Sequence, residues 1–293
     1  MLMPTSSYLF LNGLRFHYLN WGGEGRPIVL LHGLASNARI WDLVAPRLVT
    51  AGFRVLALDQ RHHGLTDDAD DGFDFPGIVR DLHAFIDTLQ LEQPLLVGHS
   101  WGAGTVLNYA AARPAGAAGI VLVDGGTSEL NAVPGMTWEQ AEQMLRPPDL
   151  DGMPREDFIA RLKGWTGDFY RAEMDDIVLA GFVIQADDTL RRKLPIPKHM
   201  RIARAIYEQK TAELFARVRC PILLCPASAP GPHDERAEQF IARKRESVAR
   251  AEQVNPQART IWFENTAHDI PLHRPAELAQ AILDFGRLRG ISD

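Results

Sequence analysis

The spacing of hydrophobic residues changes along the chain after about residue 20. Before that point, residues 8–11 and 14–18 are two β-rich runs joined by Asn12-Gly13, the commonest two-residue turn of a β-hairpin. After it, short and fully apolar runs alternate with longer amphipathic segments, which is typical of a parallel sheet buried between helices. The apolar runs cover residues 28–31, 55–58, 95–97, 120–123, 222–224 and 260–263. The predicted helices cover about residues 40–51, 76–90, 102–113, 234–252 and 275–287.

One long interval breaks this alternation. Residues 127–217 are rich in Pro, Met, Trp and charged residues, and they predict several short helices rather than strands. Within this interval, the Leu-Pro-Ile-Pro sequence of residues 194–197 indicates an extended link between two helices. The pattern therefore predicts an α/β fold with a mostly parallel central sheet flanked by helices. It divides the chain into a first core part (residues 1–126), a helical cap or lid inserted after the sixth strand (127–217) and a second core part (218–293).

The sequence Gly98-His99-Ser100-Trp101-Gly102 fits the Gly-x-Ser-x-Gly pattern of a nucleophilic serine. The bare pattern is weak evidence, but here it directly follows an apolar strand and directly precedes a good helix. Such a turn holds the serine hydroxyl clear of the sheet, and the two glycines avoid collisions inside so tight a bend. The helix start also directs free backbone N–H groups toward an oxyanion. The alternative interpretation is a glycine-rich turn in which Ser100 only caps the helix.

With this motif and the order of its elements, the chain resembles the α/β-hydrolase superfamily over nearly its whole length. It is similar to the capped members, which include esterases, lactonases, carbon–carbon bond hydrolases, haloalkane dehalogenases and epoxide hydrolases. The last two use an aspartate where this chain has Ser100, which argues against both. The resemblance implies that Ser100 is the nucleophile and that the backbone N–H groups of Leu34, in His32-Gly33-Leu34, and of Trp101 form the oxyanion hole. The alternative for residues 32–34 is an ordinary strand-ending turn.

A serine hydroxyl needs a base to remove its proton, and the chain offers ten histidines. His268 follows the last predicted strand and precedes the final helix, the loop in which the superfamily carries its catalytic histidine. We therefore expect His268 to be the general base. His273, five residues later, is the second choice because it lies at the approach to the last helix.

The acid that would orient this histidine has two candidates. Many relatives carry the acid shortly after the strand predicted at 222–224, but the sequence there departs from the family's pattern, and Asp234 is also well placed to cap the following helix. Some capped relatives instead carry it at the end of the strand before the insertion, where Asp124 stands. A charge at the tip of a buried strand needs a partner, and a protonated His268 would be one. We therefore favour Asp124 and keep Asp234 as the alternative.

A turn at residues 59–64, Asp-Gln-Arg-His-His-Gly, resembles the superfamily's Asp-x-Arg-Gly-His-Gly turn, with His62 where glycine is usual. Two adjacent histidines and an aspartate could suggest a metal site. Adjacent residues of an extended chain point in opposite directions, however, and no second set of ligands stands out. We interpret the segment as a structural turn and expect neither a metal nor a cofactor.

Composition limits the partners of the protein. The net charge is −6 and no dense stripe of Lys and Arg occurs, which argues against nucleic acid, and the basic cluster at residues 243–245 is interpreted as a solvated helix face. No run reaches the ~20 apolar residues of a membrane span, so no membrane partner is expected. The two cysteines, Cys220 and Cys225, stand too far apart on one strand to be bridged. With no secretion signal, these features predict a cytoplasmic protein; the oligomeric state is left open.

These residues predict acyl transfer to water. The expected substrate is a small to medium, mainly apolar carboxylic ester or lactone, with apolar lid side chains forming part of the pocket. One alternative is a carbon–carbon bond hydrolase that uses the same three residues and binds a substrate carboxylate through lid cations. An alternative of another class is a non-catalytic ligand-binding protein on the hydrolase scaffold.

Overall fold

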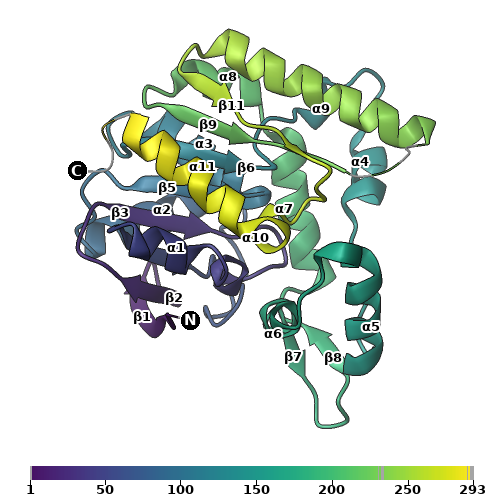
Figure 1. Cartoon of the computed structure of the whole chain (residues 1–293). Helices are drawn as coiled ribbons and strands as arrows, with labels where there is room; N and C mark the ends of the chain where they lie inside the picture. Colours follow the sequence, from purple (N-terminus) through teal and green to yellow (C-terminus); the bar gives the residue numbers. More distant parts are fainter. Residues whose placement is uncertain (1, 230, 232–233, 289, 291–293) are drawn as a thin grey trace.

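A computed structural model describes residues 2–229, 231, 234–288 and 290 of the chain. Its centre is a twisted sheet with helices on both faces (Figure 1). In the described residues this sheet has eight strands in the order β1-β2-β4-β3-β5-β6-β9-β11. Their bounds are β1 Thr5–Leu11, β2 Leu14–Gly22, β3 Pro27–Leu31, β4 Arg54–Leu58, β5 Leu95–His99, β6 Gly119–Val123, β9 Ile222–Cys225 and β11 Ala258–Thr260. The pairs β1–β2 and β2–β4 are antiparallel and the others are parallel, which confirms the predicted fold class.

The first hairpin forms where the sequence predicts it. Leu11 pairs with Leu14, so Asn12 and Gly13 are the two turn residues. Both have positive φ angles, 47° and 82°, as a type I′ turn requires. Asn and Gly are the residues that tolerate this conformation at the lowest cost, and therefore the turn fixes the register of the two strands.

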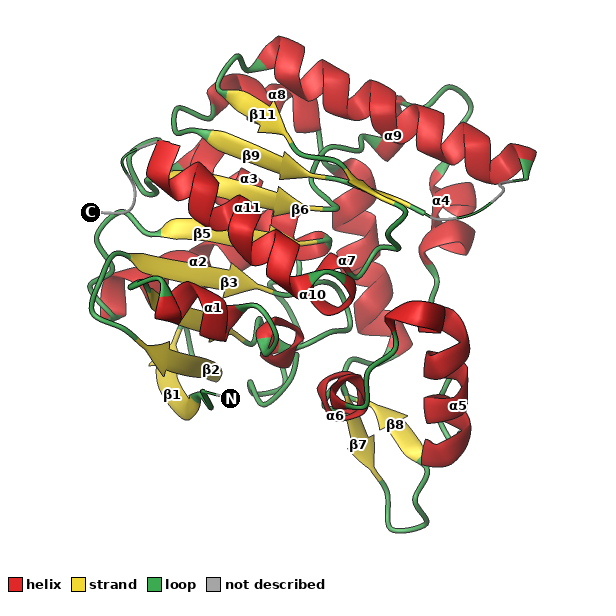
Figure 2. Cartoon of the chain, viewed as in Figure 1, coloured by secondary structure: helices red, strands yellow, loops and turns green. Residues whose placement is uncertain are grey.

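The central strands are apolar throughout because both of their faces are buried. Ile28 and Leu30 of β3 belong to the core beneath α1 (Ala45–Thr50) and α11 (Pro275–Leu288). Val29 and Leu31 point the other way, into the core beneath α2 (Phe75–Thr88) and α3 (Trp101–Ala112). Successive side chains of a strand alternate between its faces, so two buried faces require an unbroken apolar run. Figure 2 shows α1 and α11 in front of the sheet.

Two predicted elements are wrong in detail. The helix expected at residues 40–51 consists of a 3₁₀ helix, η1 (Ala38–Trp41), and the separate α1, in whose first turn Pro46 stands. The strand expected at 260–263 ends at Thr260, and β12 (Phe263–Glu264) pairs with β10 (Ala227–Ser228) outside the main sheet. The proline of the partner segment, Pro226, has no N–H to donate, which interrupts the ladder between the two pairings.

The insertion (residues 127–217) departs from the sequence prediction at one point, because it contains a hairpin as well as helices. Its two strands, β7 (Phe182–Ile184) and β8 (Leu190–Arg192), have three residues each and carry too short a pattern to be recognised. Its helices are α4 Trp138–Leu145, α5 Arg155–Thr166, α6 Glu173–Leu179, α7 Ile196–Glu208 and α8 Thr211–Arg217, with the 3₁₀ helices η2 Leu130–Ala132 and η3 Gly167–Phe169.

The extended link predicted at 194–197 is shorter than expected. Pro195 is extended, with φ −63° and ψ 147°, but α7 already begins at Ile196 and contains Pro197 in its first turn. A proline in this position costs a helix nothing, because the first N–H groups of a helix have no partner inside it.

The part of the insertion from η2 to α7 lies beyond the carboxyl ends of the parallel strands (Figure 2). Its last helix, α8, packs on the sheet instead, with Phe215 buried in the core beneath α2 and α3. The Asn37 side chain donates to the Ile177 carbonyl over 3.2 Å, and the Phe169 ring stacks on His273 with centroids 4.8 Å apart. On its other side, Lys193 and Lys198 pair with Asp68 and Asp70 at 3.1 and 2.9 Å. The insertion thus contacts the loops that follow β3, β4 and β12. No helix in the described ranges is long and apolar enough to cross a membrane.

Candidate active site

Ser100 occupies a strained turn between β5 and α3. Its φ and ψ angles are 54° and −116°, a conformation that L-residues rarely adopt, and its N–H donates to the Val123 carbonyl over 2.8 Å. A Cβ atom built on Gly98 would lie 2.1 Å from the Gly102 carbonyl oxygen, so no side chain fits inside the bend. The local sequence therefore forms the sharp strand-to-helix turn that the Gly-x-Ser-x-Gly pattern predicts.

Asp124 and His268 lie within hydrogen-bond distance, although 144 positions separate them in the sequence. Asp124 directly follows β6, and its side chain is only 4% exposed. The Nδ1–H of His268 donates to Asp124 Oδ2 over 2.6 Å, and about half of the His268 side chain, 52%, is exposed to solvent. Asp124 Oδ1 accepts two further hydrogen bonds, each 2.8 Å long, from the Ala227 N–H and from Lys244 Nζ. Both oxygens of this carboxylate are thus engaged by donors.

His268 lies close to the serine turn. The residue before Ser100, His99, donates its Nε2–H to the His268 carbonyl over 3.0 Å, and the two imidazole centroids are 4.8 Å apart. A Cβ atom on Gly125, the residue after Asp124, would lie 2.2 Å from the Ser100 carbonyl oxygen. In the part of the chain that the structure describes, no hydrogen bond joins the Ser100 hydroxyl to His268. Catalytic hydrogen bonds of this kind are often long in unliganded enzymes and tighten when substrate binds.

The charges around His268 determine its basicity. Partial burial lowers the pKa of His268, but the hydrogen bond to Asp124 and the charge of that carboxylate outweigh it and raise the pKa above its ordinary value. Burial raises the pKa of Asp124, yet the hydrogen bond to His268, with the charges of His268 and Lys244, holds the pKa well below its usual range. Burial and the neighbouring His268 lower the pKa of His99 to about 4, so His99 is neutral at pH 7.

The residues expected to form the oxyanion hole flank Ser100. Trp101 is the first residue of α3, and the loop that carries Leu34 approaches the serine closely, since a Cβ on Gly33 would lie 3.0 Å from Ser100 Cβ. Among the described residues, neither the Leu34 N–H nor the Trp101 N–H has a hydrogen-bond acceptor. Two backbone donors beside a serine are suited to a developing oxyanion.

His63, part of the turn interpreted from sequence as structural, contacts both the loop that carries Leu34 and the Trp101 side chain. Its Nδ1–H donates to the Arg61 carbonyl over 2.8 Å, so its Nε2 can accept the N–H of Ala35, 3.2 Å away. Ala35 has a φ of 60°, and this hydrogen bond helps to hold the strained loop. The same imidazole stacks on Trp101, with centroids 5.2 Å apart and an interplanar angle of 28°. Burial and the nearby His32 hold the pKa of His63 well below its ordinary value, which keeps it an acceptor.

The two alternative residues lie elsewhere. Asp234 Oδ1 accepts the Ala237 N–H over 2.8 Å and caps α9 (Glu235–Val254), the role that its position before a predicted helix also suggested. His273 is buried in the short helix α10 (Ile270–His273), stacked on Phe169. The histidine that contacts Asp124 is His268.

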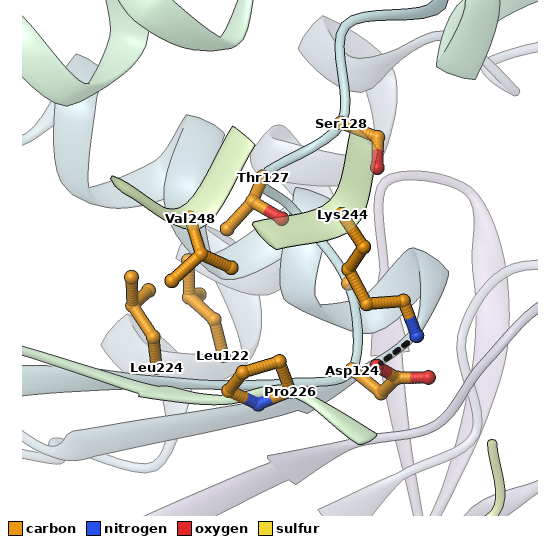
Figure 3. A pocket seen from close by; sticks show the side chains of 9 residues that line it. Leu122, Asp124, Thr127, Ser128, Leu224, Pro226, Lys244 and Val248 are labelled. Carbon is orange, nitrogen blue, oxygen red and sulfur yellow. Dashed lines mark hydrogen bonds and ion pairs between the residues drawn. The ribbon is translucent and has the colours of Figure 1, made fainter. Parts of the chain in front are cut away.

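The interpretation of residues 243–245 as a solvated face is wrong for the middle residue. Arg243 is exposed, but only 16% of the Lys244 side chain is, and it reaches Asp124 (Figure 3). Arg245 pairs with Glu264 at 2.8 Å and lies over the Trp262 ring, 4.3 Å from its centroid. Lys244 stands four residues before Val248, which is buried, so the two lie on one face of α9. This i, i+4 spacing to a buried valine is the feature of the sequence that could have predicted a buried Lys244.

An eight-stranded α/β sheet carrying a serine turn, with an aspartate–histidine pair at the carboxyl ends of its strands, defines the α/β-hydrolase class. A profile of the Alpha/beta hydrolase family matches residues 28–281, and the chain belongs to this family. The chain therefore has the fold of this family.

Two curated relatives and one solved structure illustrate the similarity. The chain is 37% identical to a non-heme chloroperoxidase of Kitasatospora aureofaciens over 98 residues, 33% of this chain and 35% of that protein. The match to this and to two further haloperoxidases spans about a third of the length of each of those proteins. It is 28% identical to N-formylmaleamate deformylase of Pseudomonas putida over 268 residues, 89% of this chain and 88% of that protein. The structure of E-2-(acetamidomethylene)succinate hydrolase superimposes with a TM-score of 0.75 at 21% identity, covering 96% of this chain and 98% of the other.

Proposed function

We propose that this protein is a serine hydrolase that cleaves a small to medium, mainly apolar carboxylic ester or lactone through an acyl-enzyme. In this proposal Ser100 is the nucleophile, His268 the general base and Asp124 the acid, while the N–H groups of Leu34 and Trp101 stabilise the oxyanion. The observation that carries it is the 2.6 Å hydrogen bond between His268 Nδ1–H and Asp124 Oδ2, made beside the strained Ser100 turn.

The proposed reaction has two halves. Because Asp124 holds the proton of His268 on Nδ1, the Nε2 atom is free to accept the proton of Ser100 as Oγ attacks the substrate carbonyl. The protonated imidazole then gives this proton to the leaving alcohol, and the ester bond breaks. A water molecule, deprotonated by the same Nε2 atom, attacks the acyl-enzyme, releases the acid and restores Ser100. Neither half requires a metal or a cofactor.

Apolar side chains near Trp101 support an apolar substrate. Trp101 belongs to a small buried cluster with Leu194 and Ile202 of the insertion, and Leu34 packs against it. A substrate held between this cluster and Ser100 would contact hydrophobic groups from both the insertion and the core. We propose on this basis that residues 127–217 act as a cap domain between the core parts 1–126 and 218–293. A cytoplasmic location stays a prediction from the sequence.

A second candidate reaction is the hydrolysis of an amide or formamide bond by the same residues. It is favoured by the similarity to N-formylmaleamate deformylase, which extends over nearly the full length of both chains. A carbon–carbon bond hydrolase with the same triad remains the third option. The buried guanidinium of Arg192, which such a reaction could use for a substrate carboxylate, donates to the Pro148 carbonyl. This contact does not favour a carbon–carbon bond hydrolase over the ester, lactone or amide reactions.

The decisive experiment replaces Ser100 by alanine. The enzyme and the variant are assayed on p-nitrophenyl esters of increasing chain length, on a lactone panel and on N-formyl and N-acyl amides. We expect Ser100→Ala to lose at least about 10⁴-fold in turnover and to escape labelling by a fluorophosphonate probe, which should modify Ser100 in the native protein. Ser7→Ala, in the edge strand β1, is the matched control and should behave as the native enzyme. Retention of most activity by Ser100→Ala would show that Ser100 is not the nucleophile. A native protein that hydrolyses none of these substrates and is inert to the probe would favour a binding protein on this scaffold.

A further inference from the structure

Lys244 extends from α9 to the same carboxylate that binds His268. Its Nζ atom lies 2.8 Å from Asp124 Oδ1 and 3.0 Å from the Ala227 carbonyl oxygen. Figure 3 shows the side chain crossing the space between α9 and the end of β6, with its amine directed at the carboxylate. The side chains of both partners are largely buried, 16% and 4% exposed. A lysine this buried and this close to a carboxylate is an ion pair that solvent screens only in part.

The two oxygens of Asp124 are divided between these partners. Lys244 Nζ and the Ala227 N–H both donate to Oδ1, so Oδ2 is the oxygen that faces His268. Rotation of the carboxylate away from His268 would break both contacts to Oδ1. Lys244 therefore fixes the direction of the acceptor that His268 uses, and it also places a positive charge on the far side of that acceptor.

In the described part of the chain, the other ionisable groups around His268 are two histidines and one carboxylate, and only the carboxylate acts against the charge of Lys244. The nearby histidines are His99 of β5, which is neutral at pH 7, and His273 of α10. Burial lowers the pKa of His273 as well. The next residue, Asp269, is half-exposed to solvent and lies 3.8 Å from His99 Nε2. Among the described residues, the charged groups that act on the imidazole are thus two carboxylates, Asp124 and Asp269, and the ammonium of Lys244.

We propose that Lys244 is a positioning residue of the active site that orients Asp124 and limits the basicity of His268. This inference rests on the proposed function. Asp124 stabilises the imidazolium and thereby favours the protonated, inactive form of the base at rest. The ammonium of Lys244 offsets part of that stabilisation, so that more of the enzyme carries a neutral His268 near and below pH 7. The structure thus assigns Lys244 a place beside Ser100, His268 and Asp124, at a position that the serine-hydrolase pattern does not include.

The test compares two neutral variants. Lys244→Met removes both the charge and the hydrogen bond, whereas Lys244→Gln removes the charge and can still donate to Asp124. At a half-exposed site, a unit charge on the far side of a shared carboxylate shifts a pKa by about 0.5 to 1 unit. We therefore expect the acid limb of the kcat/KM profile to move up in pH by about that amount in both variants. Lys244→Arg should keep the native limb, and so should Arg243→Met, the matched control on the adjacent, exposed residue.

A second readout does not depend on turnover. The imidazole C–H signal of His268, assigned with His268→Asn, is followed by NMR through a pH titration of the native protein and of the variants. The pKa of His268 should rise by the same interval in Lys244→Met and Lys244→Gln. Thermal melts establish that each variant is folded, and Lys244→Gln serves if Lys244→Met is not.

Three outcomes overturn or separate the proposals. If the pKa of His268 and the acid limb stay within about 0.2 unit of the native values in both neutral variants, Lys244 is only an anchor for α9 and the inference is wrong. If Lys244→Met alone is altered, the hydrogen bond orients Asp124 but the charge does not act on His268, which contradicts the electrostatic part of the inference. If the native enzyme hydrolyses none of the substrates while the NMR shift is present, the serine-hydrolase proposal fails and the electrostatic role of Lys244 stands.

Discussion

Replacement of Asp124 by asparagine tests the proposed acid through hydrogen-bond geometry. Asparagine has nearly the same shape as aspartate, but one of its two side-chain groups donates and the other accepts. Asp124 Oδ1 faces two donors, the Ala227 N–H and Lys244 Nζ, both at 2.8 Å. The asparagine carbonyl must therefore stay on that side, and the amide NH₂ must face His268 Nδ1.

An NH₂ group next to Nδ1 reverses the tautomer of the imidazole. Nδ1 then accepts, the proton moves to Nε2, and the atom that should take the Ser100 proton already carries one. The same exchange in Ser-His-Asp proteases lowers turnover about 10⁴-fold, which corresponds to about 5 kcal/mol of transition-state stabilisation. We expect Asp124→Asn to lose 10³- to 10⁴-fold in kcat, with a much smaller change in KM.

Asp234→Asn is the matched control, since the same chemical change is made at the alternative position. Asp234 caps α9 through the Ala237 N–H, and asparagine caps a helix about as well as aspartate does. Its activity should therefore stay within about twofold of native. The assay is steady-state hydrolysis of the best ester or amide found in the substrate screen, with thermal melts to verify folding. If Asp124→Asn keeps activity within tenfold of native, or if only Asp234→Asn loses it, the assignment of the acid is wrong.

Asp124→Asn should also change how stability depends on pH. The pKa of Asp124 is lowered in the folded protein, so its charge stabilises the fold at pH values above its unfolded pKa of about 3.9. That contribution is lost as the pH falls from there toward the lower folded value. Urea melts should show the variant to be less stable than native at pH 6 and the difference to shrink below pH 4. A constant difference across this range would contradict the depressed pKa.

Two further predictions concern the base and the oxyanion loop. The pKa of His268 is raised above 6.5, and only the neutral imidazole accepts the serine proton. When kcat/KM is measured between pH 5 and 9, it should therefore fall on the acid side with a midpoint above pH 6.5. A midpoint at or below pH 6.5 would contradict this. His63→Phe keeps a ring to stack on Trp101 but removes the acceptor of the Ala35 N–H, so kcat should fall about 10-fold with little change in KM. His63→Gln should recover part of the loss. Equal activity of both variants would show that the loop does not need this acceptor.

The local features of the candidate active site follow closely from the sequence. An apolar strand, two glycines around Ser100 and a helical pattern directly afterwards leave the backbone little choice, because a Cβ at Gly98 would collide with Gly102. The same holds for the hairpin at Asn12-Gly13 and for the buried strands, whose unbroken apolar runs reflect two buried faces. Each of these signals lies within a dozen residues, the range over which local patterns are informative. The β7–β8 hairpin escaped prediction because its strands are too short to show alternation.

Contacts between distant segments needed the three-dimensional arrangement. Asp124 and Asp234 both follow or flank predicted strands, and only the packing of β6 beside β5 and β9 brings the first of them against His268. Lys244 looked like one of several surface cations, yet the way α9 crosses the sheet directs it at the carboxylate, 120 positions away in the chain. Periodicity reports which face of a helix is apolar, whereas the partner of a single polar group on that face is set by the element packed opposite. For this reason the serine turn could be predicted from its neighbours in the chain. The sequence favoured Asp124 without separating it from Asp234, and only the fold showed that Asp124 contacts His268 and that Lys244 lies behind it.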